Sequence, residues 1–233
     1  GIQSVTFPAA LESIGEAAFH NCQSLATVTF PEGSKLTSIG VAAFSETSIQ
    51  SVSFPAALES IGTAAFQSCQ SLATVTFAEG SKLTSIGARA FSETSIQSVT
   101  FPAALESIGF RAFADCQSLA TVTFPEGSKL VDLGGSNGNV FRNTPITRLD
   151  LSHTRIADVH GATFRGMQST LEEVYFPPTL ATMKGFMDHT CDSCYYCDVC
   201  KSVPDLLDPE TNQTVTDPDG NVIPDVDAGG AAI

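Results

Sequence analysis

Short segments in which every second residue is apolar recur along the whole chain. In the segment Leu25 to Phe30, Val28 and Phe30 alternate with Thr27 and Thr29. Such alternation is typical of a β-strand that buries one face and exposes the other. Segments with the pattern apolar-x-x-apolar-x-apolar begin at Ile2, Leu25, Ile49, Leu72, Ile96, Leu119, Ile146 and Leu171. The pattern therefore predicts about eight equivalent strands, and the first six begin 23 or 24 residues apart.

A second apolar pattern follows each strand segment. In the first unit it reads L-x-x-I-G-x-x-A-F and includes Leu11, Ile14, Gly15 and Phe19. We expect its apolar residues to form the opposite inner wall, and the glycine to permit a tight turn. Each unit then has a strand, a corner, a short return segment and a second corner. The same reasoning covers the later glycines and the prolines that end the strands, namely Gly40, Gly62, Gly87 and Gly109, and Pro8, Pro55 and Pro102.

The units are copies of one another. A block of 47 residues from Ile2 to Ser48 restarts almost verbatim at Ile49 and again, diverging partway, at Ile96. The two halves of each block also match, so the structural unit is about 23 residues long. Each coil of such a chain is sealed by its neighbours, and no second core is needed. We predict a mostly β repeat solenoid over residues 1–190, with short turns or 3-10 segments on its convex side.

The repeat motif carries a family resemblance. The pattern L-x-x-[IV]-x-[FL]-P, followed by L-x-x-I-G-x-x-A-F-x-x-C, resembles the BspA-type leucine-rich repeat of microbial surface proteins. The resemblance runs from Ile2 to about Phe186 and is strongest through Leu130. A GGSNGN insertion precedes Phe141, and the unit from Ile146 is similar to a more typical leucine-rich repeat. The resemblance implies a noncatalytic protein-interaction or adhesion module, on a cell surface or secreted, with a protein or extracellular-matrix ligand.

Charge and hydropathy further restrict the classes of partner that we expect. The formal net charge of -14 argues against nucleic acid as a partner, because phosphates would be repelled. No run approaches the roughly 20 apolar residues of a membrane span. The chain begins inside a repeat without Met, so we interpret it as a fragment whose signal and N-terminal cap lie upstream. We expect a monomer that needs no cofactor.

Three cysteines occupy one repeat position. Cys22, Cys69 and Cys116 are 47 residues apart, which places them two coils from one another. Two rungs of a sheet span about 10 Å, which exceeds the roughly 7 Å Cα limit for a disulfide. We therefore predict buried free thiols that act as small apolar residues in the core.

A second group of cysteines is contiguous and forms its own segment, residues 191–201. Cys191, Cys194, Cys197 and Cys200 are each separated by two residues. Disulfides that cap the last coil are the favoured interpretation, because ten contiguous residues struggle to hold four thiolates around one zinc ion. A zinc site, an iron-sulfur cluster and reduced thiols remain alternatives. A metal site would instead indicate an intracellular scaffold.

Residues 202–233 form an acidic, proline-containing tail, which we expect to be disordered or a linker. Within it, the segment DPDGNVIPD resembles a thrombospondin type 3-like calcium repeat, with Asp217, Asp219 and Asp225 as possible ligands. A plain acidic linker explains the same residues.

The exposed strand positions decide what the sheet could bind. In the first six units they are all Ser or Thr, and they lack the aromatic and Arg side chains of typical binding hot spots. The last two units place Arg148, Asp150, Glu173 and Tyr175 on the same side. We identify these four residues as the candidate ligand-binding site. The alternative is a solvated edge on which the charges pair only with one another.

The sequence also bears on two other function classes, ice binding and catalysis. Regular Thr-x-Thr rungs resemble ice-binding β-solenoids, because hydroxyls would recur about 7 Å along each strand and about 4.8 Å between rungs. Curvature of the sheet would spoil such a lattice match. Catalysis is not predicted, since no histidine is spaced with a base, nucleophile and orienting carboxylate; the four histidines are His20, His153, His160 and His189.

Overall fold

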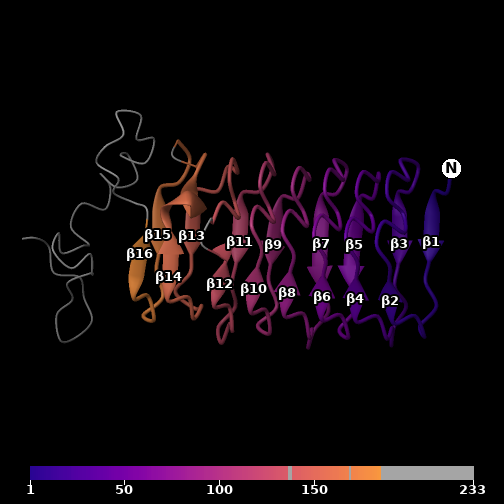
Figure 1. The fold of residues 1–233 in the computed structure, drawn as a ribbon, viewed down its shortest axis with the longest axis horizontal. Helices are drawn as coiled ribbons and strands as arrows, with labels where there is room; N and C mark the ends of the chain where they lie inside the picture. Colours follow the sequence, from indigo (N-terminus) through magenta and orange to yellow (C-terminus); the bar gives the residue numbers. More distant parts are fainter. Residues whose placement is uncertain (136–137, 168, 185–233) are drawn as a thin grey trace, which may run out of the picture.

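The computed structural model describes residues 1–135, 138–167 and 169–184. In this part of the chain, eight strand pairs wind into a parallel β-solenoid with almost no helix, as predicted (Figure 1). The first strands of the pairs form one side: β1 (Ser4–Thr6), β3 (Thr27–Thr29), β5 (Ser51–Phe54), β7 (Thr74–Phe77), β9 (Ser98–Thr100), β11 (Thr121–Thr123), β13 (Arg148–Asp150) and β15 (Glu173–Tyr175). We call this side the odd-strand face.

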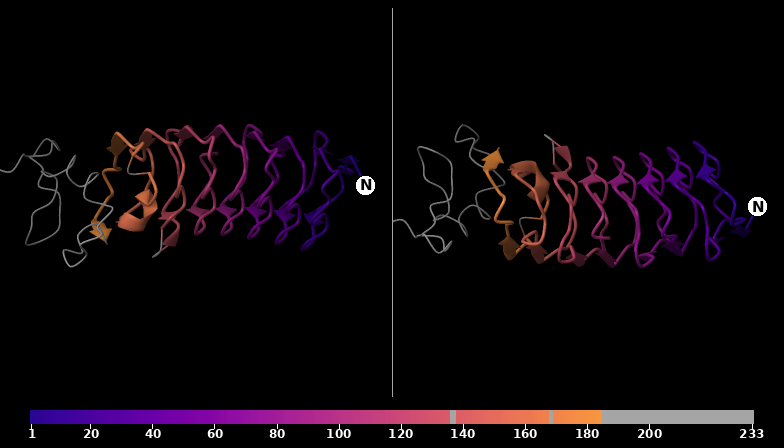
Figure 2. Two further views of the ribbon diagram at one scale, coloured as in Figure 1. Left: turned by 90° about the horizontal axis from the view of Figure 1, so that it is seen from above. Right: turned by 90° about the horizontal axis from the view of Figure 1, so that it is seen from below.

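The return segments form the other side of the solenoid. They are β2 (Ser13–Ile14), β4 (Ser38–Ile39), β6 (Ser60–Ile61), β8 (Ser85–Ile86), β10 (Ser107–Ile108), β12 (Asp132–Leu133), β14 (Asp158–His160) and β16 (Thr182–Lys184). The first six pair as one continuous parallel sheet, and β14 pairs with β16. A short 3-10 helix, η2 (Gly161–Phe164), follows β14. The two turned views show the coils stacked in a nearly straight row from the N-terminus to β16 (Figure 2).

Alternation within each strand sends one set of side chains into a single core that runs along the axis. Leu25, Ile49 and Leu72, which begin successive units, are fully buried. A column of phenylalanines lies on the opposite inner wall, with stacked neighbours 5.1–5.3 Å apart between ring centroids. Its members are Phe19, Phe44, Phe66, Phe91 and Phe113. Each coil therefore seals the next, as the repeat pattern predicted.

The glycines that recur in the repeats were predicted to permit a tight turn, and this prediction was wrong. Gly15 and its counterparts do not have positive φ; the left-handed positions lie two residues later and are held by residues such as Ala42 (φ 51°) and Ala64 (φ 55°). A Cβ on Gly62 would lie 2.7 Å from the carbonyl carbon of Gly40 in the neighbouring coil. Glycine is required there because two backbones approach closely, and not because the chain turns.

The repeat-position cysteines are free thiols, as predicted. Cys69 and Cys116 are buried and Cys22 is half-buried. The thiol of Cys69 donates a hydrogen bond to the carbonyl oxygen of Phe44 at 3.1 Å, and its Sγ lies 3.3 Å from Oγ1 of Thr47. Cys116 makes the same contacts with Phe91 and Thr94. The thiols thus satisfy buried polar groups in addition to filling space.

Candidate functional site

The odd-strand face presents hydroxyl groups over its first six strands. Thr27 and Thr29 of β3 are exposed while Val28 between them is buried, and the other strands repeat this pattern. Parallel pairing aligns the hydroxyls in columns, as with Thr76 of β7, whose Oγ1 donates to Oγ of Ser53 on β5 at 2.9 Å. This part of the face is uncharged, as the sequence indicated.

The hydroxyl columns do not form one uninterrupted sheet. Strands β1, β3, β5 and β7 form one sheet, and β9 and β11 form another. Even within the first sheet, β3 and β5 are joined only at Thr27 and Ser51. The solenoid is nearly straight in Figure 2, which removes the curvature objection to ice binding. The hydroxyl rungs are nevertheless not held in one continuous hydrogen-bonded sheet, which a single regular array of hydroxyls would favour.

The four candidate residues are brought together on the last two strands. In the parallel pair β13 and β15, Arg148 lies opposite Glu173 and Asp150 lies opposite Tyr175. All four side chains therefore share one patch, which we call the Arg148 cluster. The sequence predicted this placement from the alternation of each strand.

Mutual contacts order the Arg148 cluster. The guanidinium of Arg148 lies 3.6 Å from a carboxylate oxygen of Asp150 and 3.8 Å from one of Glu173. Its central carbon lies 4.4 Å from the centroid of the Tyr175 ring. The hydroxyl of Tyr175 donates to Oε2 of Glu173 at 3.3 Å. These contacts fit both interpretations of the sequence, because a paired edge can also be a binding surface.

The side chains of the Arg148 cluster are exposed even though they contact one another. The side chains of Arg148 and Glu173 are 57% and 53% exposed, and Tyr175 is 41% exposed. Hydrogen bonds from Ser152 hold the pKa of Asp150 below its ordinary value, and the charge of Arg148 adds to this effect. An ionised carboxylate beside an arginine and a tyrosine offers a partner both charge and an aromatic surface.

Sequence reasoning missed a second surface feature. Two grooves open along one edge of the odd-strand face, over the corners that follow β5 and β9. The signal was present in the sequence, because corners reading F-P-A-A-L alternate with longer corners reading F-P-E-G-S-K-L or F-A-E-G-S-K-L.

The remaining predicted sites are not tested by the described residues. Cys191, Cys194, Cys197 and Cys200 lie outside them, as do Asp217, Asp219 and Asp225. Within the described part of the chain, no group of three or more His, Cys, Asp or Glu side chains is placed to hold a metal ion. Nor does that part contain a helix long and apolar enough to cross a membrane.

His160, at the end of β14, has a structural contact. Its Nδ1 accepts a hydrogen bond from the backbone N–H of Ala162 at 3.3 Å and caps η2. The contact gives His160 a role in holding the local fold.

Comparison with known proteins agrees with the architecture. A family model described as BspA type Leucine rich repeat region matches in six copies, over residues 1–119 and 84–208. No curated protein matches the chain.

Solved structures show the same fold. The pneumococcal vaccine antigen PcpA is similar with a TM-score of 0.56 and 23% identity, over 76% of this chain and 51% of that protein. The leucine rich repeat protein of T. pallidum is similar with a TM-score of 0.51 and 22% identity, over 86% of this chain and 83% of that one. This chain therefore spans about half the length of the pneumococcal antigen, 51%.

Proposed function

Because the chain belongs to the BspA-type leucine-rich repeat family, we propose that it is a noncatalytic adhesion or protein-interaction module, displayed on a cell surface or secreted. The Arg148 cluster is its ligand-binding site, and a protein or an extracellular-matrix component is its partner. One observation carries this assignment: the cluster supplies an exposed aromatic ring and an arginine on a face that elsewhere carries only hydroxyls.

The residue types of the Arg148 cluster favour it over the hydroxyl columns as the binding site. Tyr and Arg are enriched among the residues that dominate binding energy at interfaces, whereas Ser and Thr are under-represented. The pairing of Arg148 with Tyr175 also restricts both side chains before a partner arrives, so less conformational entropy is lost on binding. The partner should present a carboxylate to Arg148 and an apolar group to the ring of Tyr175.

Binding to immobilised collagen, fibronectin and laminin tests the proposal. We expect saturable binding of the purified chain to at least one of these proteins. Arg148→Ala and Tyr175→Ala should each weaken that binding by about tenfold or more, as expected for hot-spot residues. Thr27→Ala is the matched control, since Thr27 is exposed on the same face at β3. Equal binding by all variants, or no binding to any of the three, would contradict the assignment.

The extracellular location has its own test at the cysteine segment. Outside the cell, Cys191, Cys194, Cys197 and Cys200 are expected to be disulfide-bonded. Alkylation before and after reduction, followed by intact mass measurement, distinguishes the possibilities. Protection of the four thiols until reduction supports the proposal. A retained zinc or iron-sulfur mass would favour the intracellular scaffold instead.

Ice binding is not adopted, because strand pairing is reduced between β3 and β5 and absent between β7 and β9, so the hydroxyl rungs do not belong to one continuous sheet. Ice recrystallisation that was inhibited by the chain, but not by Thr74→Tyr, would reverse this judgement.

A further inference from the structure

Phenylalanines at the ends of the face strands stack in pairs rather than in one column. Phe54 and Phe77 stack with centroids 5.4 Å apart, and Phe7 with Phe30 and Phe101 with Phe124 do the same at 5.2 and 5.1 Å. Among the described residues, no ring contact joins Phe30 to Phe54 or Phe77 to Phe101. The same two places are where strand pairing is reduced or absent. The coils are thus grouped in twos along this edge.

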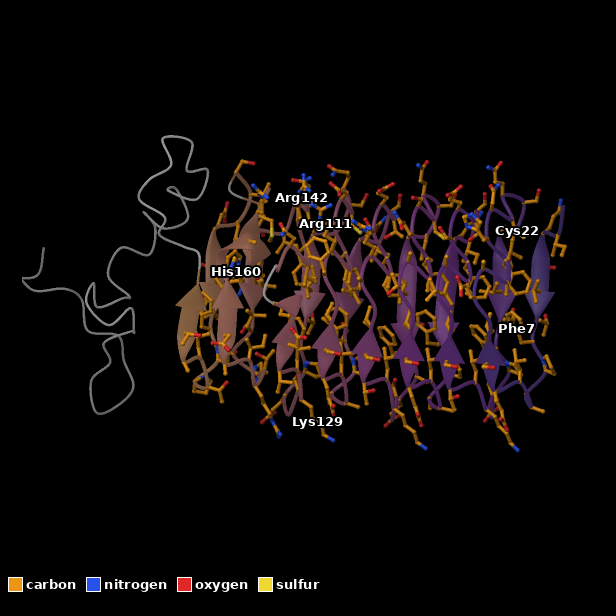
Figure 3. The ribbon with its side chains drawn as sticks, viewed as in Figure 1. Phe7, Cys22, Arg111, Lys129, Arg142 and His160 are labelled. Carbon is orange, nitrogen blue, oxygen red and sulfur yellow. The ribbon has the colours of Figure 1, made fainter. Side chains whose placement is uncertain are left out.

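The corners that follow these phenylalanines have two lengths. Long corners such as Ala78 to Lys82 hold a glycine at positive φ, Gly80, and expose Glu79 and Lys82; we call these long corners ridges. Short corners such as Pro102 to Ala104 lie between two ridges. In Figure 3, Lys129 of one long corner projects from the lower edge of the solenoid, the edge opposite Arg142. A groove therefore forms over each short corner that has a ridge on both sides.

The two grooves share an equivalent set of lining residues at the corners, and the larger one also extends along β7 and β9. The groove over the corner after β9 has a volume of about 750 Å³, and Phe77, Phe101, Ala103 and Ala104 are among the residues that line it. The groove over the corner after β5 has a volume of about 530 Å³, with Phe30, Phe54, Ala56 and Ala57 in the same places. Phe30 and Phe77 are half-buried, so each groove exposes part of an aromatic ring.

The distance between the grooves restricts what can occupy both. They lie two coils apart, and neighbouring parallel strands are about 4.8 Å apart, so the grooves repeat at about 9.6 Å. A polyproline II helix has three residues per turn and advances about 9.3 Å per turn. Every third residue of such a helix would therefore meet an equivalent groove. An extended β-strand repeats at about 6.8 Å and falls out of register after one groove.

The residues that line the grooves also favour a ligand in the polyproline II conformation. Proline-rich segments dock in grooves walled by aromatic residues, and they lose little conformational entropy because the helix is preformed. Here a phenylalanine edge, alanine methyls and a proline ring surround each groove. Each groove also has a carboxylate on one ridge and an ammonium on the other: Glu79 and Lys129 for the larger, Glu32 and Lys82 for the smaller. A charged residue beside each proline could pair with these rims.

We propose that this edge of the solenoid binds a proline-rich segment of a partner protein in the polyproline II conformation, running along the solenoid axis with every third residue in a groove. The site is separate from the Arg148 cluster, which lies on β13 and β15.

Fluorescence anisotropy with labelled peptides tests the proposal. The probe is a dodecaproline peptide, and the control is (Gly-Ser)6, which has the same length but is flexible. A second pair of peptides, (Pro-Ser-Ser)4 and (Pro-Ser-Ser-Ser)3, compares a three-residue period with a four-residue period. We expect dodecaproline to bind, (Gly-Ser)6 not to bind, and the three-residue period to bind more tightly than the four-residue period.

Groove-filling variants locate the binding. Ala56→Gln and Ala103→Gln each place a longer side chain at a position that lines a groove, and together they should weaken dodecaproline binding by about tenfold or more. The matched control is Ala9→Gln. The carbonyl oxygens of Ala9, Ala56 and Ala103 all accept from the backbone N–H of a lysine of the next coil, but Ala9 belongs to the first short corner and has a long corner on one side alone within the described residues.

Three outcomes would overturn the proposal. They are no binding of dodecaproline, equal binding by the double variant, and binding of a β-1,4-linked hexasaccharide in place of the peptide. Arg148→Ala should leave dodecaproline binding unchanged, so a failure of the adhesion assignment is distinguishable from a failure here.

Discussion

Arg148 and Tyr175 lie diagonally across strands β13 and β15, with the guanidinium carbon 4.4 Å from the ring centroid. Diagonal neighbours on a sheet are within reach of long and aromatic side chains. The contact therefore depends on parallel pairing in the register that sets Arg148 opposite Glu173.

We expect Arg148 and Tyr175 to be energetically coupled, although weakly, because both are exposed. A double-mutant cycle of Arg148→Ala and Tyr175→Ala, measured by urea unfolding, should give a coupling free energy of about 0.5–1 kcal/mol. The pair Arg155→Ala and Tyr175→Ala serves as the control, since Arg155 is exposed and lies outside the cluster. Additive effects in the first cycle would show that the observed stacking has no energetic consequence.

The pKa of Asp150 should rise toward its ordinary value in Ser152→Ala. The side-chain hydrogen bond from Ser152 is the largest cause of the lowered pKa, and the nearby charge of Arg148 contributes less. Titration of the carboxyl carbon by NMR measures the change, and Arg148→Gln should raise the pKa less than Ser152→Ala does.

The lowered pKa of Asp150 also makes the stability of the fold depend on pH. The folded state binds the proton less tightly than the unfolded state, so the contribution is present above the unfolded pKa of about 3.9 and is lost as pH falls through the folded pKa. Ser152→Ala should therefore lose less stability than the wild type on acidification. Equal acid sensitivity would contradict the assignment of Ser152 as the main cause.

Gly62→Ala should destabilise the solenoid strongly. Its new Cβ would lie 2.7 Å from the carbonyl carbon of Gly40, and backbone cannot yield cheaply, so we expect a loss of about 3 kcal/mol or more in chemical denaturation. Gly15→Ala is the matched control, because nothing lies within 4 Å of the Cβ position there and its φ is not positive. That variant should stay within about 1 kcal/mol of the wild type. Similar losses in both would refute the packing explanation.

Cys22 should react with iodoacetamide before Cys69 and Cys116. Burial raises the pKa of the Cys69 and Cys116 thiols, so at pH 8 fewer of them are the reactive thiolate, and the reagent also has less access. Peptide mapping by mass spectrometry over time should show Cys22 labelled about tenfold faster or more. Equal rates for the three thiols would mean that the coils open more readily than the packing indicates.

The raised pKa values also predict a loss of stability in alkali. The neutral thiol is favoured in the fold, so the contribution is complete below the unfolded pKa of about 8.5 and is lost as pH rises through the folded pKa. Cys69→Ala should reduce this alkaline sensitivity, which unfolding measurements at pH 8 and pH 10 would detect.

The repeat pattern predicted the architecture well because a solenoid is made of contacts between equivalent positions. Once Val28 is identified as inward-facing, Val52 and Val75 follow from the repeat, and the register of each strand is set by the position of its buried residues. The grouping of Arg148, Asp150, Glu173 and Tyr175 was predictable for the same reason. Their mutual distances were not, since rotamers and diagonal contacts are absent from a sequence pattern.

The glycine and phenylalanine positions show where such reasoning stops. Glycine recurs at the positions of Gly40 and Gly62 in the repeats. A glycine needed for a turn and a glycine needed for a close backbone approach would both recur in this way, so the sequence does not distinguish them. Phe30 and Phe54 look equivalent to Phe54 and Phe77, yet only the second pair stacks.

The sequence by itself determined the repeat length, the strand positions and the side of each strand that is buried, because these depend on alternation and on spacing between equal units. The tertiary structure alone decided where strand pairing is reduced along one face, how the Arg148 cluster pairs, and why glycine is needed at Gly62. Those features depend on distances of a few ångströms between coils, which the spacing of residues along the sequence does not specify.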